Sequence, residues 1–128
     1  MARMTLASHP ELYTIHSFSS DCTIPAEIFQ QEMFFIGKTK DEISVVVSSK
    51  LALDSIEQED DWRCLEVIGP LGFSMTGILA NVSSTLANEK ISIFAISTFD
   101  TDYILVKKET LEAATKALKK KNYQIIDY

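Results

Sequence analysis

The second half of the sequence changes its hydrophobic periodicity in a fixed order, and this order is the strongest constraint on the fold. The segment "WRCLEVIG" (62–69) mixes β-branched, aromatic and aliphatic residues, which predicts a strand that ends at the turn-forming pair Gly69-Pro70. The next segment, "GFSMTGILANVSSTLANEK" (72–90), predicts a helix with Ser74 as its N-cap. Its apolar residues recur at steps of three and four, as one face of a helix requires: Met75, Ile78, Leu79, Val82 and Leu86.

Two strands, a second helix and a final strand follow. The segments "ISIFAISTF" (91–99), "YILVKKE" (103–109) and "YQIIDY" (123–128) predict strands, the first two joined through residues 100–102. The helix predicted over "ETLEAATKALKKKN" (109–122) has acids in its first turn and lysines in its last, which matches the helix dipole. The order βαββαβ is that of the ferredoxin-like α+β fold, in which two helices cover one face of an antiparallel sheet.

The first half repeats this order in a weaker form. The acidic stretch Glu57–Asp61 leaves little room for a fourth strand, so this unit either lacks one or borrows it. We therefore predict two βαββαβ-like units in tandem, a degenerate one over residues 1–61 and a regular one over 62–128, with Glu57–Asp61 as linker. The weaker elements are a strand (11–18), a short helix (25–31), two strands around a polar turn (33–49) and a stub of a second helix (51–56).

Both faces of the strand predicted over residues 91–99 are apolar. Ile91, Ile93 and Ala95 lie on one face, and Phe94 and Ile96 lie on the other. Because the helices cover only one face of the sheet, the other should be covered by the first unit, by a second subunit or by both. We expect a homodimer or side-by-side packing of the two units.

Charge and cysteine usage exclude several classes of function. The formal net charge is -6 and the pI is near 4.8, which disfavours nucleic-acid binding. Cys22 and Cys64 are far apart and lack the spacing of a zinc or redox site, so we expect no metal and no cofactor. No apolar run is long enough for a signal peptide or a membrane span, which predicts a cytoplasmic protein that does not bind membranes.

The chain offers no recognisable catalytic arrangement. Gly72 and Gly77 have the spacing of a phosphate-binding loop, but Ile78 stands where that motif requires lysine. The two imidazoles, His9 and His16, accompany no nucleophile motif and are interpreted as surface or partly buried residues. We therefore predict that the protein is not an enzyme.

Two aspartates interrupt the strand-forming sequence "ISTFDTDYILV" (96–106). Asp100 suits a turn, whereas the pair could also be read as a divalent-metal site, and Asp102, beside an apolar strand, would suit a bound ammonium group. The loop "IGPLGFSMTG" (68–77) supplies glycines and the N–H groups that open a helix, which favour a carboxylate. Together these features describe an amino-acid pocket, as one hypothesis among several.

The segments "GPLGFSMTGIL" and "ISTFDTDYILV" resemble the ACT-domain family of amino-acid-sensing modules, and in particular small bacterial tandem ACT-like proteins related to the cytosolic arginine sensors. The resemblance is close over about the last 65 residues. It implies regulatory, allosteric binding of an amino acid or similar small zwitterion at an interface between ACT units. In the arginine sensors a glycine-phenylalanine loop, matched by Gly72 and Phe73, lies over the ligand, and an aspartate matched by Asp102 receives its cationic groups.

The candidate ligand-binding residues lie in these two segments. The loop contributes Gly72, Phe73, Ser74, Met75, Thr76 and Gly77, and the hairpin contributes Ser97, Thr98, Asp100 and Asp102.

Overall fold

The computed structural model describes residues 4–69 and 77–128. Contacts within the chain divide it into two compact units. The inserted unit consists of Glu11–Trp62, and the C-terminal unit combines Met1–Pro10 with Arg63–Tyr128. The predicted units were residues 1–61 and 62–128, whereas this division groups the first ten residues with the C-terminal unit and Trp62 with the inserted unit. The interpretation of residues 1–61 as a degenerate ACT-like unit stays a prediction.

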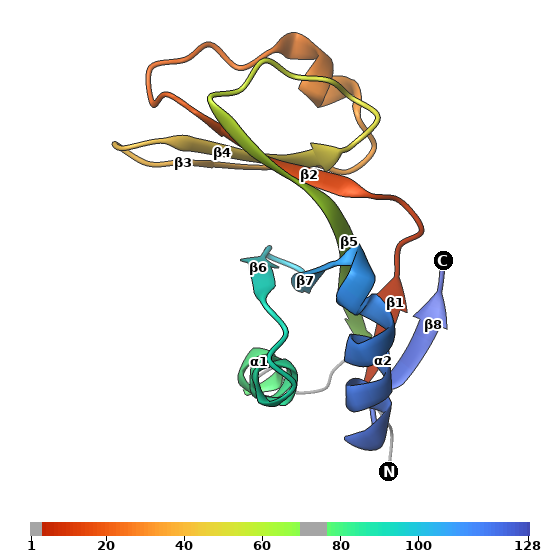
Figure 1. The fold of residues 1–128 in the computed structure, drawn as a ribbon. Helices are drawn as coiled ribbons and strands as arrows, with labels where there is room; N and C mark the ends of the chain where they lie inside the picture. Colours follow the sequence, from red (N-terminus) through yellow and green to blue (C-terminus); the bar gives the residue numbers. More distant parts are fainter. Residues whose placement is uncertain (1–3, 70–76) are drawn as a thin grey trace. The chain divides into compact units, whose positions relative to one another are not determined.

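The inserted unit is an antiparallel sheet with one short helix. Its strands run in the order β3-β4-β2-β5, and each neighbouring pair is antiparallel. The core contains Phe18, Ile28, Ile43, Val45 and Val47. The elements are β2 (Tyr13–Phe18), the 3-10 helix η1 (Ala26–Gln30), β3 (Phe35–Lys38), β4 (Ile43–Ser48) and the beginning of the long strand β5 (Glu57–Gly69; Figure 1).

The C-terminal unit has the predicted alternation of strands and helices. Its strands run in the order β6-β7-β5-β1-β8. The predicted βαββαβ order is confirmed, because β5, α1, β6, β7, α2 and β8 follow one another along the chain. The elements are β1 (Thr5–Ser8), the end of β5, α1 (Ile78–Asn88), β6 (Ile93–Ser97), β7 (Asp102–Lys107), the 3-10 helix η2 (Lys108–Thr110), α2 (Leu111–Lys120) and β8 (Gln124–Asp127).

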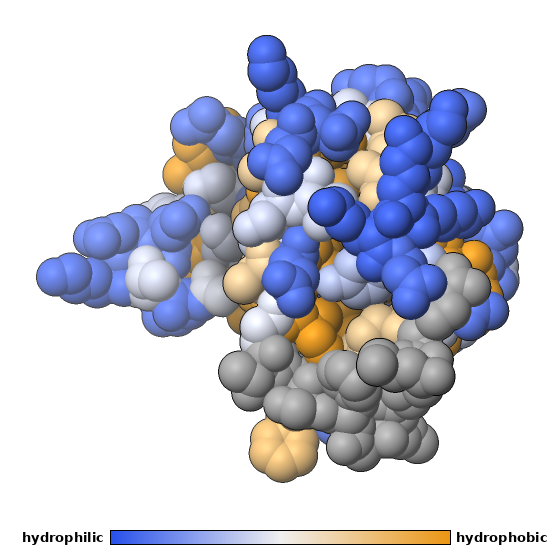
Figure 2. Space-filling view, turned by 90° about the horizontal axis from the view of Figure 1, so that it is seen from below, coloured by the Kyte–Doolittle hydropathy of each residue, from blue (hydrophilic) through white to orange (hydrophobic). Residues whose placement is uncertain are grey.

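Both helices of this unit pack on one face of its sheet. Alternate residues of β5 and β7 reach the same core as the buried sides of α1 and α2, because side chains on a strand point to opposite faces in turn. The core comprises Leu6, Leu65, Val67, Ile104 and Val106 from the strands and Ile78, Val82, Leu86, Ala114 and Leu118 from the helices. In the view of Figure 2, hydrophilic residues cover most of the surface that is drawn in colour, and hydrophobic residues show between them.

Strand β1 was not predicted from the sequence. It lies between β5 and β8, antiparallel to β5 and parallel to β8. Within residues 4–69 and 77–128, the sheet of the C-terminal unit therefore has one more strand than the predicted four, and β1 and β8 form a parallel pair. The four residues of β1 are too few to show a periodicity, and pairing on both sides rather than local preference holds them extended.

Two predictions for the stretch before Trp62 are wrong. Residues Glu57–Asp61 are not a linker but the beginning of β5, which pairs with β2 and supplies the missing fourth strand. Residues 51–56 form no helix. Leu51 and Leu53 pack against the core of the inserted unit at a spacing of two, which suits an extended chain better than a helix.

The predicted N-cap of the first long helix is also wrong. Helix α1 begins at Ile78, and its N-cap position is Gly77 rather than Ser74. Gly77 has a φ of 82°, in the left-handed region that favours glycine. Among the described residues, no helix is long and apolar enough to cross a membrane.

The shared core predicts the effect of truncating a helix residue. Leu118 is fully buried, so Leu118→Ala should lower the free energy of unfolding by about 2–5 kcal/mol. Leu111, on the same helix but only partly buried, is the matched control. Leu111→Ala should lower the free energy of unfolding clearly less. Urea denaturation of both variants measures the difference, and equal losses would contradict this packing.

Candidate functional site

The tip of the β6–β7 hairpin is a tight turn closed by main-chain and threonine hydrogen bonds. The Thr98 N–H donates to the Thr101 carbonyl at 2.8 Å, and the Thr98 hydroxyl donates to the same oxygen at 3.1 Å. Asp100 lies exposed within this turn, where the sequence predicted a turn residue. Phe99 beside it is fully exposed, at 104% relative accessibility.

Asp102 occupies a more sheltered position at the start of β7. It is half-buried and pairs across the hairpin with Ser97, whose hydroxyl donates to Asp102 Oδ1 at 2.6 Å. Alternation along β7 puts Asp102 on the same face as the core residues Ile104 and Val106. The carboxylate is thus held by one hydroxyl at the end of the face that carries the helices.

The hairpin tip lies beside the end of β5. The Thr101 hydroxyl donates to the carbonyl of Val67, two residues before β5 ends at Gly69. The chain then continues to Gly77, whose carbonyl accepts the first helical hydrogen bond of α1 from the Asn81 N–H at 2.8 Å. The end of β5, from which the predicted ligand-binding loop departs, therefore lies next to the hairpin tip.

The predicted site residues divide into two groups. Gly72, Phe73, Ser74, Met75 and Thr76 lie outside the described residues. Gly77, Ser97, Thr98, Asp100 and Asp102 are described, and of these Ser97 and Asp102 are in direct contact. A shared cleft between the loop and the hairpin stays a prediction.

The buried thiol of Cys64 offers little reactive chemistry. Burial, reinforced by the negative charge of Glu66, raises the pKa of Cys64 to about 12, so its thiol is protonated at neutral pH. Within residues 4–69 and 77–128, no group of three histidine, cysteine or acidic side chains is placed to hold a metal ion.

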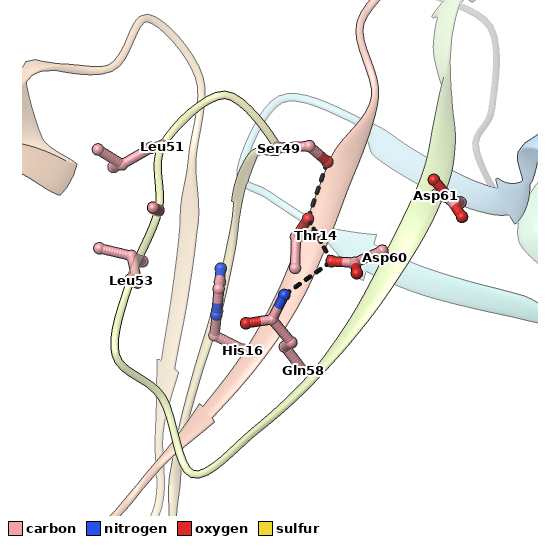
Figure 3. Close-up of a pocket in the computed structure, with 9 residues that line it drawn as sticks. Thr14, His16, Ser49, Leu51, Leu53, Gln58, Asp60 and Asp61 are labelled. Carbon is pink, nitrogen blue, oxygen red and sulfur yellow. Dashed lines mark hydrogen bonds between the residues drawn. The ribbon is translucent and has the colours of Figure 1, made fainter.

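The inserted unit contains a cavity that the sequence did not predict. It has a volume of about 330 Å³ and lies between strands β2 and β5 and the segment that follows β4 (Figure 3). The residues that line it are Thr14, His16, Ser49, Leu51, Ala52, Leu53, Gln58, Asp60 and Asp61.

Hydrogen bonds fix the polar wall of this cavity. The Asp60 carboxylate accepts from the Thr14 hydroxyl at 3.1 Å and from the Gln58 amide at 2.9 Å. Figure 3 shows this carboxylate directed toward both partners, with Asp61 on the opposite side of β5. The register of β2 against β5 shifts at this point, and Asp61 has a φ of 70°, so a local irregularity of β5 positions these aspartates.

His16, like Thr14, is a buried member of this group. It is only 2% exposed, and its Nδ1 lies 2.8 Å from the Ser55 hydroxyl. Burial lowers the pKa of His16 below its ordinary value of 6.5, and the negative charge of Asp60 opposes this effect in part. The interpretation of His16 as a surface or partly buried residue is therefore wrong. The sequence did contain a signal for its burial. His16 lies two residues before Phe18, and in β2 alternate residues are buried.

Comparison with known proteins gives consistent results. The family model of the ACT domain matches residues 57–120. The human protein CASTOR3P is 32% identical over 114 residues, which make up 89% of this chain and 60% of that protein. The human cytosolic arginine sensor for mTORC1 subunit 1 is 36% identical over 61 residues, 47% of this chain and 18% of that protein. This chain thus spans less than two thirds of the length of either relative.

The fold also matches a solved structure along its whole length. Protein Atu0741 from Agobacterium tumefaciens superimposes with a TM-score of 0.91 at 30% sequence identity, covering 100% of this chain and 96% of that one.

The lowered pKa of His16 predicts a pH dependence of stability. In the unfolded chain His16 takes up a proton near pH 6.5, whereas in the folded chain it does so only at a lower pH. The contribution of His16 to the free energy of unfolding should therefore be intact above pH 6.5 and fall as the pH drops toward the folded-state pKa, by at most about 1.4 kcal/mol per pH unit. Urea denaturation across this range should show a shallower decline for His16→Gln than for the wild type. If the free energy of unfolding falls equally with pH in both proteins, the lowered pKa of His16 is contradicted.

Proposed function

Because this chain belongs to the ACT domain family, we propose that it is a regulatory protein that binds an amino acid or a similar small zwitterion and catalyses no reaction itself. The observation that carries the proposal is the geometry of the hairpin tip. There the half-buried Asp102 carboxylate is fixed by Ser97 beside the end of β5. We place the protein in the cytoplasm.

The proposed site has two parts, one that favours a positively charged group and one that favours a negatively charged group. Asp102 would accept the ammonium group of the ligand, while the residues that lead into α1 would offer N–H groups to its carboxylate. The contributing residues are those named from the sequence: Gly72 to Gly77 in the loop, and Ser97, Thr98, Asp100 and Asp102 in the hairpin. The Thr101–Val67 hydrogen bond supports this pairing, because it holds the hairpin tip next to the strand from which the loop departs.

The identity of the relatives supports an amino acid as ligand. One of them is named as a cytosolic arginine sensor, and the similarity to it extends over 61 residues. A regulatory role requires that the ligand bind one conformational or oligomeric state better than another, since equal affinity for two states shifts nothing. We propose that the ligand joins two ACT units and thereby stabilises the state in which they are joined.

A protein-interaction module without a ligand is the second candidate, and the hairpin also carries the observation that favours it. Phe99 is fully exposed at the tip, and large exposed aromatic side chains are enriched at protein interfaces. This function would need Phe99 and its surroundings but no pocket.

A thermal-shift screen against the twenty amino acids separates the two candidates. A ligand present at 100 times its Kd should stabilise the folded protein by about 2.7 kcal/mol, which raises the melting temperature. We expect one amino acid or a small group of related ones to do so. If none of the twenty raises the melting temperature, the interaction module is the better description.

The aspartate itself can be tested once a ligand is found. Asp102→Ala should abolish the stabilisation by the ligand while the unliganded protein keeps its circular dichroism spectrum. Asp41→Ala is the matched control, because Asp41 is an exposed aspartate in the turn between β3 and β4. Calorimetry that gives Asp102→Ala the affinity of the wild type would remove Asp102 from the site.

We further propose that the protein forms a homodimer. Phe94 and Ile96 point away from the helices, because β6 pairs with β7 in a register that puts Phe94 opposite Leu105 rather than beside the core residues Ile104 and Val106. Both side chains are only half-buried. Light scattering should give twice the monomer mass, and Ile96→Glu should lower it because a charge cannot be buried at such an interface. A monomeric wild type would contradict the proposal.

A further inference from the structure

The cavity of the inserted unit is distinct from the proposed hairpin site and belongs to a separate compact unit. Its most informative atom is Nε2 of His16. This nitrogen is buried and has no hydrogen-bond partner among the described residues, although the other ring nitrogen contacts Ser55. A buried polar atom left unpaired costs about 1–3 kcal/mol, so its position in the wall of a cavity points to a group that binds there.

The charge of the cavity indicates what kind of group this is. Two of its nine lining residues are aspartates, and none is lysine or arginine. Asp60 is held in place by Thr14 and Gln58, so its charge is fixed at the wall rather than moving freely in solvent. A fixed negative charge favours a cation and disfavours any ligand that carries a carboxylate.

The wall opposite the strands contributes main-chain atoms. Leu51 and Leu53 pack against the core of the inserted unit, and Figure 3 shows their side chains directed away from Asp60. The main chain of this segment and the side chain of Ala52, which alternation directs the other way, therefore border the cavity. Carbonyl oxygens of a main chain accept hydrogen bonds, as carboxylates do, and an ammonium group has three N–H donors to offer.

We propose that this cavity binds a small primary ammonium ion, with its nitrogen between the Asp60 carboxylate and Nε2 of His16. In this arrangement Nε2 accepts a hydrogen bond from the ligand, and Nδ1–H of the same ring donates to the Ser55 hydroxyl. The ligand is an amine without a carboxylate, which separates this site from the zwitterion site proposed at the hairpin. The proposal does not depend on the hairpin site.

The test is a titration of the whole protein with ethylammonium chloride, followed by ¹H–¹⁵N NMR. We expect chemical-shift changes concentrated at the residues that line the cavity. Tetramethylammonium has the charge but no N–H donor, and ethanol has a donor but no charge, so both should bind more weakly. Asp60→Asn keeps the size of the side chain and removes its charge, and should weaken ethylammonium binding by about fivefold or more.

Two matched variants complete the design. Glu59→Gln removes one charge from the neighbouring position of β5, where Glu59 is exposed and does not line the cavity, and should leave binding unchanged. Asp102→Ala should also leave it unchanged. The proposal is overturned if ethylammonium produces no shifts in the inserted unit, if Asp60→Asn binds as tightly as the wild type, or if Asp102→Ala removes the binding.

Discussion

The pairing of β5 with its neighbours is the constraint on which the rest of the structure depends. This strand has 13 residues, and it is hydrogen-bonded to β2 near its start and to β1 and β7 further on. Its two halves differ in burial, because the acidic beginning is exposed while Cys64, Leu65 and Val67 near its end are buried. This strand contacts the hairpin tip and lines the cavity of the inserted unit. The hairpin tip is bonded to the Val67 carbonyl, and Asp60 projects from the irregular part of the strand.

Much of the C-terminal unit could be predicted because its local and tertiary preferences agree. The apolar residues of α1 and α2 recur at helical spacing, and the same residues form the buried core. The first half of β5 and the four residues of β1 could not be predicted in this way. In both segments, hydrogen bonds to distant strands decide the conformation, and a run of acids such as "EQEDD" has a low intrinsic preference for strands.

The same distinction applies to the functional sites. The sequence of the hairpin is distinctive because two carboxylates interrupt an apolar stretch, and the structure places Asp102 against Ser97 in a regular strand pair. The cavity could not be predicted from the sequence, because its lining residues come from segments that share no sequence pattern. Thr14 and His16 lie on β2, Ser49 follows β4, and Asp60 was assigned to a linker. The register of β2 against β5 brings Gln58 and Asp60 beside Thr14 and His16, and the pairing of β2 with β4 brings Ser49 to them.

The position of β1 has a consequence for how the chain reaches this fold. Thr5 pairs with Gln124, and the hydroxyl of Thr5 donates to the Gln124 side chain across a sequence separation of 119 residues. During synthesis on the ribosome, β1 is made before β8 and cannot complete its pairing until residues 124–127 have been made. Contacts so distant in sequence slow folding, because loop-closure entropy is lost before they form. The C-terminal unit thus cannot complete its sheet until β8 has been made, whereas the strand pairs of the inserted unit lie within residues 11–62.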